Sequence, residues 1–162
     1  MYDFHMKDLD IARVHARALE EAKKIYAKET TRRNRSMDEV LRTTMLGHFA
    51  ECHLIDNCGW HDDSRPFRDV ISPRDEPVDC KVATKESNVW HLLNRLAMEN
   101  GWKKVQYVAM WVNDGPKYKF YGFYSWNGME FIPFEWDTQA DQDRIKELKD
   151  EQEYLENNSK TF

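Results

Sequence analysis

Residues 77–83 have the sequence PVDCKVA, an apolar stretch that one acid and one base interrupt. The stretch has the composition of an extended strand. In a strand, residues two apart project from the same face, so Asp79 and Lys81 point together while Cys80 turns into the core. This arrangement places an acceptor for a metal ion beside a cation that suits a phosphate or a water nucleophile.

The acid-x-Lys pattern acquires meaning only from its surroundings. It also occurs in Glu21-Ala22-Lys23 and Glu147-Leu148-Lys149, both inside charged runs with helical periodicity. Asp79 alone lies in a strand-like segment, with Asp69 in a similar segment before it and Glu51 in a helical one. The interpretation therefore depends on whether these acids come together in the fold.

Periodicity divides the chain into helical and extended segments. Helical spacing or a charged helical composition predicts helices over residues 7–28, 36–56, 88–100 and 138–157. Alternation with β-branched and aromatic residues predicts strands over 67–71, 78–83, 105–112, 118–125 and 129–134, and residues 57–66 have loop composition. Ser36 and Glu39 form a capping-box signature, and Gly101 is placed to end the third helix.

This order of segments is typical of a mixed α/β layer protein. A chain of 162 residues is long enough for one domain with a real core and too short for two ordinary ones. We therefore expect a single domain over residues 1–162. It would comprise an N-terminal helix and basic connector (1–35), a core (36–136) and an acidic C-terminal helix (137–162).

The net charge of −5 is unevenly distributed. Residues 130–162 contain ten acidic and four basic residues, whereas residues 1–129 contain 19 acidic and 20 basic ones. Because the acidity belongs to the C-terminal segment, the body of the protein is able to present a basic groove to a nucleic acid. The candidate phosphate contacts are Arg32, Arg33 and Arg35 in the connector, Arg42 in the second helix, and Lys85.

A divalent-metal site would suit phosphodiester hydrolysis. Oxygen-ligated Mg²⁺ needs only one or two carboxylates and accepts phosphate oxygens as further ligands. Asp69 and Asp79 would supply that pair if their strands form a hairpin, with Glu51 on the helix beside them. Lys81 would orient or help to deprotonate the attacking water, or stabilise charge on the phosphate. Alternatively, the four residues are unrelated surface charges on a half-solvated strand and its neighbours.

Three short stretches have a counterpart in a known group of enzymes. They are LGHFAE at 46–51, FRDV at 67–70 and PVDCKV at 77–82. They resemble the helix glutamate, first-strand aspartate and D-x-K strand of the PD-(D/E)xK restriction-endonuclease-like nuclease superfamily, particularly its small phage and mobile-element members. The resemblance covers residues 40–126. It implies a three-layer core in which helices flank a central mixed β-sheet, with extra N-terminal and C-terminal helices.

The resemblance also implies a role for each matching residue. Asp69 and Asp79 would ligate Mg²⁺ or Mn²⁺, with the Cys80 backbone carbonyl as a third ligand and Glu51 as a direct or water-mediated one. Lys81 would be the catalytic lysine. All four side chains would thus act in catalysis, and the substrate would be DNA.

Two details depart from the superfamily pattern. Arg68 stands where the superfamily name has proline, and Asp62 or Asp63 competes for the role of the first aspartate. Asp69 is preferred because it lies within a strand-like run, whereas Asp62 and Asp63 lie in a polar loop.

Other candidate sites are less well supported by the pattern. Cys52, His53, Cys58 and His61 are zinc-ligand types with poor spacing, and Cys52 falls on the apolar side of its helix. Trp90, His91 and Trp102 are able to stack on bases, although aromatic residues at such positions more often belong to the core. No nucleophile-elbow or phosphate-binding glycine pattern is present.

We therefore expect a Mg²⁺- or Mn²⁺-dependent endonuclease that hydrolyses DNA. The alternative is a non-catalytic nucleic-acid-binding or protein-binding module on the same fold. No apolar run approaches the roughly 18 residues of a membrane span, the N-terminus has no signal-peptide pattern, and three cysteines suggest reduced thiols. These features predict a cytoplasmic protein without membrane partners, and the long N-terminal amphipathic helix suggests a homodimer.

Overall fold

The structure is a computed structural model that describes residues 9–29, 36–62, 69–114 and 117–159. Its helices are α1 (Ile11–Glu29), α2 (Met37–Cys58), the short 3₁₀ helix η2 (Glu86–Asn88), α3 (Val89–Lys103) and α4 (Thr138–Ser159). Its strands are β1 (His61–Asp62), β2 (Val70–Ile71), β3 (Pro77–Ala83), β4 (Tyr107–Asp114), β5 (Lys117–Trp126) and β6 (Phe131–Phe134).

The strands form one mixed sheet in the order β1-β2-β3-β4-β5-β6. Strands β3 and β4 run parallel, with α3 between them in the chain, and the other neighbouring pairs are antiparallel. The predicted α/β class and the predicted hairpin of β2 and β3 are therefore confirmed.

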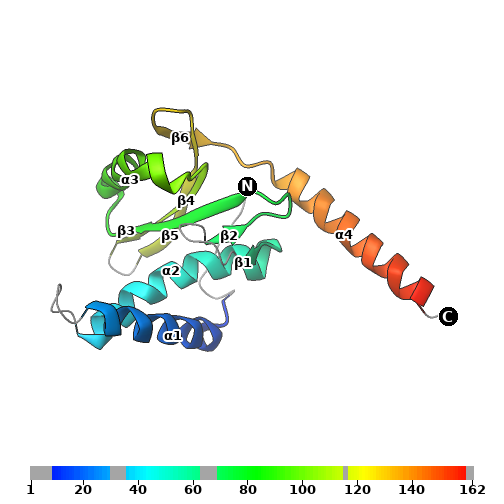
Figure 1. The fold of residues 1–162 in the computed structure, drawn as a ribbon, viewed down its shortest axis with the longest axis horizontal. Helices are drawn as coiled ribbons and strands as arrows, with labels where there is room; N and C mark the ends of the chain where they lie inside the picture. The colour runs from blue at the N-terminus through cyan, green and yellow to red at the C-terminus, as the bar shows by residue number, and fades with distance from the viewer. Residues whose placement is uncertain (1–8, 30–35, 63–68, 115–116, 160–162) are drawn as a thin grey trace.

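Helices cover both faces of the sheet (Figure 1). On one face, α2 contributes Ala50 and Leu54 to a core that contains Val78 and Cys80 of β3. On the other face, Leu93 of α3 and its neighbours pack against a second core that includes Ala83 of β3. Alternate residues of β3 thus enter different cores, as the two-residue repeat of a strand requires.

Helix α1 packs on the side of α2 turned away from the sheet (Figure 1). Its apolar residues Val14, Ala18 and Ala22 are fully buried. The helix begins at Ile11 because the Asp10 side chain accepts a hydrogen bond from the Arg13 backbone N–H at 3.2 Å, which is a helix cap. The apolar stripe that suggested pairing with a second copy is therefore used within the chain.

The predicted start of α2 is confirmed, and its end lies two residues later than expected. The Ser36 hydroxyl accepts a hydrogen bond from the Glu39 backbone N–H at 3.2 Å. Gly59 ends the helix in the left-handed conformation, with φ of 71°. A side chain at this position would also meet Ile145 of α4, because a Cβ atom there would lie 2.8 Å from its Cδ1.

The prediction that Gly101 ends α3 is wrong. The helix continues through it to Lys103, and Lys104 takes the left-handed conformation with φ of 54°. The Asn100 side chain accepts from the Val105 N–H at 2.6 Å and donates to the Val105 carbonyl at 3.0 Å. These two hydrogen bonds fix the chain reversal after Lys104, so a glycine inside the last turn is tolerated.

Strand predictions also need correction. The strand expected over 67–71 is β2 at Val70–Ile71, so Asp69 lies just before it, and residues 67–68 lie outside the described ranges. Residues 57–66 were expected to form a loop, but His61–Asp62 pair with β2 as β1, and residues 63–66 lie outside the described ranges. The last strand begins at Phe131 rather than Met129, because the Asn127 side chain accepts hydrogen bonds from the backbone N–H groups of Met129 and Glu130 and holds them in a turn.

Helix α4 extends away from the rest of the protein (Figure 1). Its base is held by Asp141, which is 1% exposed and accepts hydrogen bonds from Trp136 Nε1 at 2.7 Å and Arg74 Nε at 3.3 Å. Residues 146–158 are all exposed, as expected for the charged terminal helix. None of the helices in the described ranges combines the length and apolar character needed to cross a membrane.

Candidate active site

The β2–β3 hairpin brings the two candidate aspartates together. Val70 lies opposite Val78, and the Asp69 N–H donates to the Val78 carbonyl at 3.1 Å. Continuation of this register places Asp69 opposite Asp79, where cross-strand side chains are close neighbours. The Asp69 carboxylate also accepts a hydrogen bond from the Cys80 N–H at 2.7 Å, which extends the ladder by one side-chain contact.

Asp79 is buried, with 5% of its surface exposed. Its Oδ2 lies 3.3 Å from Lys81 Nζ. Burial raises the pKa of Asp79 to about 8, Lys81 opposes this rise, and Asp69 adds to it by its charge and by a side-chain hydrogen bond. Asp79 therefore holds a proton at neutral pH more readily than an ordinary carboxyl group does.

Glu51 approaches the aspartates from α2. It follows Ala50, which is fully buried, and lies at the edge of the stripe that α2 packs on the sheet. Its Oε2 is 3.5 Å from Arg17 Nη2 and 3.6 Å from His48 Nδ1. Burial raises the pKa of Glu51 to about 9, the Asp69 charge adds to the rise, and Arg17 opposes it.

A cavity of about 240 Å³ connects these groups. Glu51, Asp69, Cys80 and Lys81 line it together with residues of α1 and α2. Asp79 does not line this cavity, so the expectation that Asp79 and Lys81 open into one pocket is only partly correct. Asp79 instead lines a smaller cavity of about 70 Å³ beside Lys104 and Gln106, and it meets the larger one through its contacts with Asp69 and Lys81.

The carboxylate oxygens of the site suit a hard divalent cation, although they do not form a complete set of ligands around one. In the described residues, no three His, Cys, Asp or Glu side chains are placed to hold a metal ion together. Mg²⁺, however, needs only one or two carboxylates beside waters and substrate oxygens. Burial is the largest cause of the raised pKa values of Glu51 and Asp79, and the charge of Asp69 adds to both, so a bound cation would favour the ionised form of these carboxyl groups.

Comparisons of the chain gave no match to a family model and no significant match to a curated protein or a solved structure. The chemistry of the site is therefore argued from its own residues.

Helix α1 contributes polar residues that were not anticipated from the sequence. Arg17 Nη2 lies 2.6 Å from Asp62 Oδ1, and Arg17 Nη1 donates to Cys52 Sγ at 3.2 Å. His48 Nε2 is hydrogen-bonded to the Glu21 carboxylate. The signal for these contacts was the position of Arg17 and Glu21 directly beside the buried Ala18 and Ala22, which places them at the border of the helix interface.

Of the two competing aspartates, Asp62 is described by the structure, and it pairs with Arg17 rather than with Asp79. Asp62 lies on β1, its side chain is 58% exposed, and it pairs with Arg17. Asp63 and Arg68 lie outside the described residues. Within the described part of the chain, Asp69 is thus the aspartate that contacts Asp79.

Of the five basic candidates, the structure describes two, Arg42 and Lys85. Arg32, Arg33 and Arg35 lie outside the described residues, so their position is not part of the structure. Arg42 on α2 is exposed, and exposed Lys85 precedes η2. Neither of these two lines the cavity that holds the carboxylates.

The zinc ligand types do not form a site in the ranges that the structure covers. Cys52 is fully buried beside Arg17, and His53 stacks on Trp111, so the preference for a core cysteine is confirmed. The preference for core aromatic residues on α3 is wrong. Trp90 is 66% exposed and His91 is also exposed, while the side chain of Trp102 lies outside the described set.

Proposed function

We propose that the protein is a Mg²⁺- or Mn²⁺-dependent endonuclease that hydrolyses phosphodiester bonds in DNA, built on a restriction-endonuclease-like core. The observation that carries this proposal is the meeting of Asp69, Asp79, Lys81 and Glu51 at the end of the β2–β3 hairpin. Glu51 comes from α2, outside the hairpin, and its approach to Asp69 is not expected of unrelated surface charges.

The carboxylates would hold the cation. Asp69 and Asp79 would bind it directly, with the Cys80 backbone carbonyl as a third ligand, and Glu51 would complete the set directly or through water. The cation would supply Lewis-acid stabilisation of the phosphate and would lower the pKa of a bound water. Because Asp79 and Glu51 hold protons readily, cation binding would release protons from the protein.

Lys81 would act on the reacting groups. Its ammonium lies 3.3 Å from Asp79, which holds it beside the carboxylates and at the wall of the cavity. From there it would orient the attacking water or stabilise the negative charge that develops on the phosphate. Removal of a single charge-stabilising donor of this kind typically lowers the rate by about 10²- to 10³-fold.

A non-catalytic nucleic-acid-binding module is the alternative. It is favoured by the arrangement of the carboxyl groups, since no three candidate ligands in the described ranges are set to hold a metal. In that case the hydrogen-bonded Asp69 and Asp79 would serve to fix the hairpin rather than to bind a cation.

The discriminating experiment measures cleavage of supercoiled plasmid and of branched DNA with Mg²⁺, with Mn²⁺ and with EDTA. We expect metal-dependent cleavage that Lys81→Ala and Asp79→Asn reduce at least 100-fold. Lys149→Ala is the matched control, because Lys149 belongs to an acid-x-Lys pattern on the exposed part of α4. Thermal unfolding of each variant shows that it is folded.

Two results would count against the nuclease. One is a wild-type protein that leaves both substrates intact with either metal. The other is metal-dependent cleavage that persists unchanged in Lys81→Ala and Asp79→Asn, since the activity would then arise elsewhere.

A further inference from the structure

A second cavity, of about 300 Å³, lies between the end of β3 and α3. Val82, Ala83 and Thr84 line it from the strand side, and Asn88, His91 and Arg95 line it from the helix side. None of its lining residues is acidic. Its polar groups are a hydroxyl, an amide, an imidazole and a guanidinium, a set that favours an anionic ligand.

Successive residues of β3 line the two cavities. Cys80 and Lys81 line the first, and Val82 and Ala83 line the second. In an extended strand, Lys81 and Thr84 are only about 10 Å apart. The first cavity lies beside α1 and α2 and the second beside α3, on the other face of the sheet, so a nucleic-acid strand that reached both would pass around the edge of β3.

Within the described residues, strand β2 pairs with only the beginning of β3. Strand β2 pairs only with Pro77 and Val78, and Asp69 adds the contact with Cys80. Beyond that point no described strand pairs with residues 81–83 on the β2 side, whereas β4 pairs with them on the other side. A chain-like ligand therefore meets no described strand along this edge.

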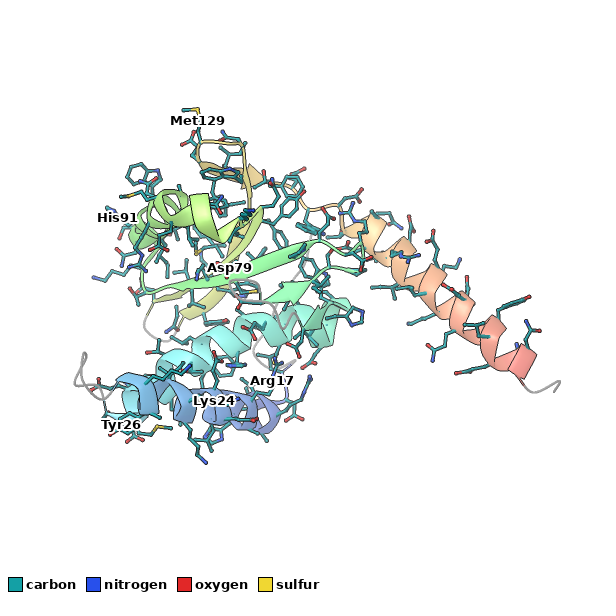
Figure 2. All side chains as sticks on the ribbon, viewed as in Figure 1. Arg17, Lys24, Tyr26, Asp79, His91 and Met129 are labelled. Atoms are coloured by element: carbon teal, nitrogen blue, oxygen red, sulfur yellow. The ribbon has the colours of Figure 1, made fainter. Side chains whose placement is uncertain are left out.

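Helix α3 carries His91 and Arg95 in the wall of the second cavity, and Trp90 lies next to His91. Trp90 is 66% exposed, and its ring contacts that of His91 edge to face at 6.0 Å. Arg95 lies one helical turn beyond His91, and exposed Lys85 stands before η2. Glu86 offsets the charge of the neighbouring Lys85. Of the charged residues named here, Arg95 is then the one that leaves a positive charge. Figure 2 shows His91 on α3, on the opposite side of the sheet from Arg17 of α1.

An exposed tryptophan beside cations suits an unpaired nucleic-acid strand. Aromatic side chains stack on base faces, and these faces are accessible in single strands but covered by neighbouring base pairs in a duplex. A volume of about 300 Å³ is at the lower limit of small-molecule pockets, enough for part of one nucleotide and too small for a double helix.

We propose that the second cavity and Trp90 form a binding subsite for an unpaired DNA strand. Arg95 and Lys85 bind its phosphates, and Trp90 with His91 stacks on a base. The position of this subsite next to the cleaved bond rests on the proposed function, whereas strand binding itself does not. The preferred substrate is accordingly DNA with an unpaired segment beside the cut.

Strand binding is tested without cleavage. Fluorescence anisotropy of a labelled oligo-dT strand is measured in EDTA with the full-length protein, and a labelled duplex of mixed sequence serves for comparison. We expect the strand to bind more tightly than the duplex. Trp90→Ala should weaken strand binding about 5- to 100-fold, while Trp90→Phe should retain most of it.

Charge contacts are tested in the same assay. Arg95→Ala should weaken binding and reduce the dependence of log K on log salt by about one phosphate contact. Tyr154→Ala and Arg144→Ala are the matched controls, because Tyr154 is 67% exposed and both lie on α4. They should bind as the wild type does, and all variants should keep the wild-type unfolding temperature.

The outcomes separate this subsite from the nuclease. If the protein binds the single strand through Trp90 and Arg95 but cleaves no DNA, the result supports the subsite and contradicts the proposed nuclease activity. Cleavage that depends on Lys81, with strand binding unchanged in Trp90→Ala and Arg95→Ala, overturns the subsite and leaves the nuclease. Equal or tighter binding of the duplex through the same two residues also overturns it.

Discussion

The carboxyl groups of Asp69 and Asp79 share a hydrogen bond across the β2–β3 hairpin. Burial raises the pKa of Asp79 most, and Asp69 adds to the rise, so Asp79 holds a proton more readily than an ordinary carboxyl group does. Lys81 lies against one member of the pair, and the Cys80 N–H binds the other. The site of the proposed chemistry is thus also the point where the hairpin is held together.

The metal-free protein should lose stability as pH rises. The pKa of Asp79 is raised from 3.8 to about 8 in the folded protein, so the folded state binds the proton more tightly. The stabilisation is complete below about pH 4 and is lost as pH approaches 8, by at most about 1.4 kcal/mol per pH unit for one group. Urea unfolding in EDTA between pH 5 and 8 measures it.

Asp79→Asn should reduce the slope of this profile, because asparagine does not titrate, and the raised pKa of Glu51 should sustain the remaining slope. Glu147→Gln removes an exposed carboxyl group from α4 and should leave the slope unchanged. A wild-type slope that Asp79→Asn does not alter would show that Asp79 is ionised in the folded protein.

Mg²⁺ or Mn²⁺ should stabilise the protein through Asp69. At 100 times the dissociation constant, binding to the folded state alone adds about 2.7 kcal/mol to the free energy of unfolding. Asp69→Asn should remove most of this effect, whereas Asp114→Asn, at the exposed end of β4, should retain it. Differential scanning calorimetry with and without metal gives the comparison. Equal metal stabilisation of both variants would exclude Asp69 as a ligand.

Arg17→Ala should destabilise the protein by about 1 to 3 kcal/mol, because it leaves the partly buried Glu51 carboxyl group without its guanidinium partner. The combined change with Glu51→Gln should cost less than the sum of the single changes. Arg13 pairs with Asp56 between the same two helices with its side chain 45% exposed, so Arg13→Ala should cost under about 1 kcal/mol. Chemical denaturation of the four variants tests this, and strict additivity would rule out the coupling.

Gly59→Ala should be more destabilising than Gly128→Ala. Both glycines have positive φ, 71° and 98°, so each substitution has a backbone cost of about 1 kcal/mol or more. Only Gly59 would also clash, since its added Cβ atom would lie 2.8 Å from Ile145 Cδ1. Ile145→Ala should recover part of the loss in the Gly59→Ala background. Equal unfolding temperatures for the two glycine variants would argue against contact between α4 and this turn.

Local patterns in the sequence predicted the elements that local forces determine. The helix cap at Ser36 and the hairpin around Asp69 and Asp79 depend on residues within a few positions of one another. The end of α3 could not be predicted in the same way, because the side chain of Asn100 rather than the glycine after it fixes the reversal.

The contacts of α1 with the site depend on packing between distant segments. Arg17 precedes Glu51 by 34 positions and Asp62 by 45, and no local periodicity encodes those pairs. The exposure of Trp90 was not predicted either, because aromatic residues on helices more often lie in the core. Which face of α3 meets the sheet is decided by Leu93 and Leu96.

The brevity of β2 gives Asp69 a second role. Only Val70 and Ile71 of β2 pair with β3, so the hydrogen bond from the Cys80 N–H to the Asp69 carboxylate also holds the hairpin together. Asparagine keeps an oxygen that can accept this hydrogen bond, whereas alanine does not. Asp69→Asn therefore removes the charge and keeps the hydrogen bond to the Cys80 N–H, whereas Asp69→Ala removes both.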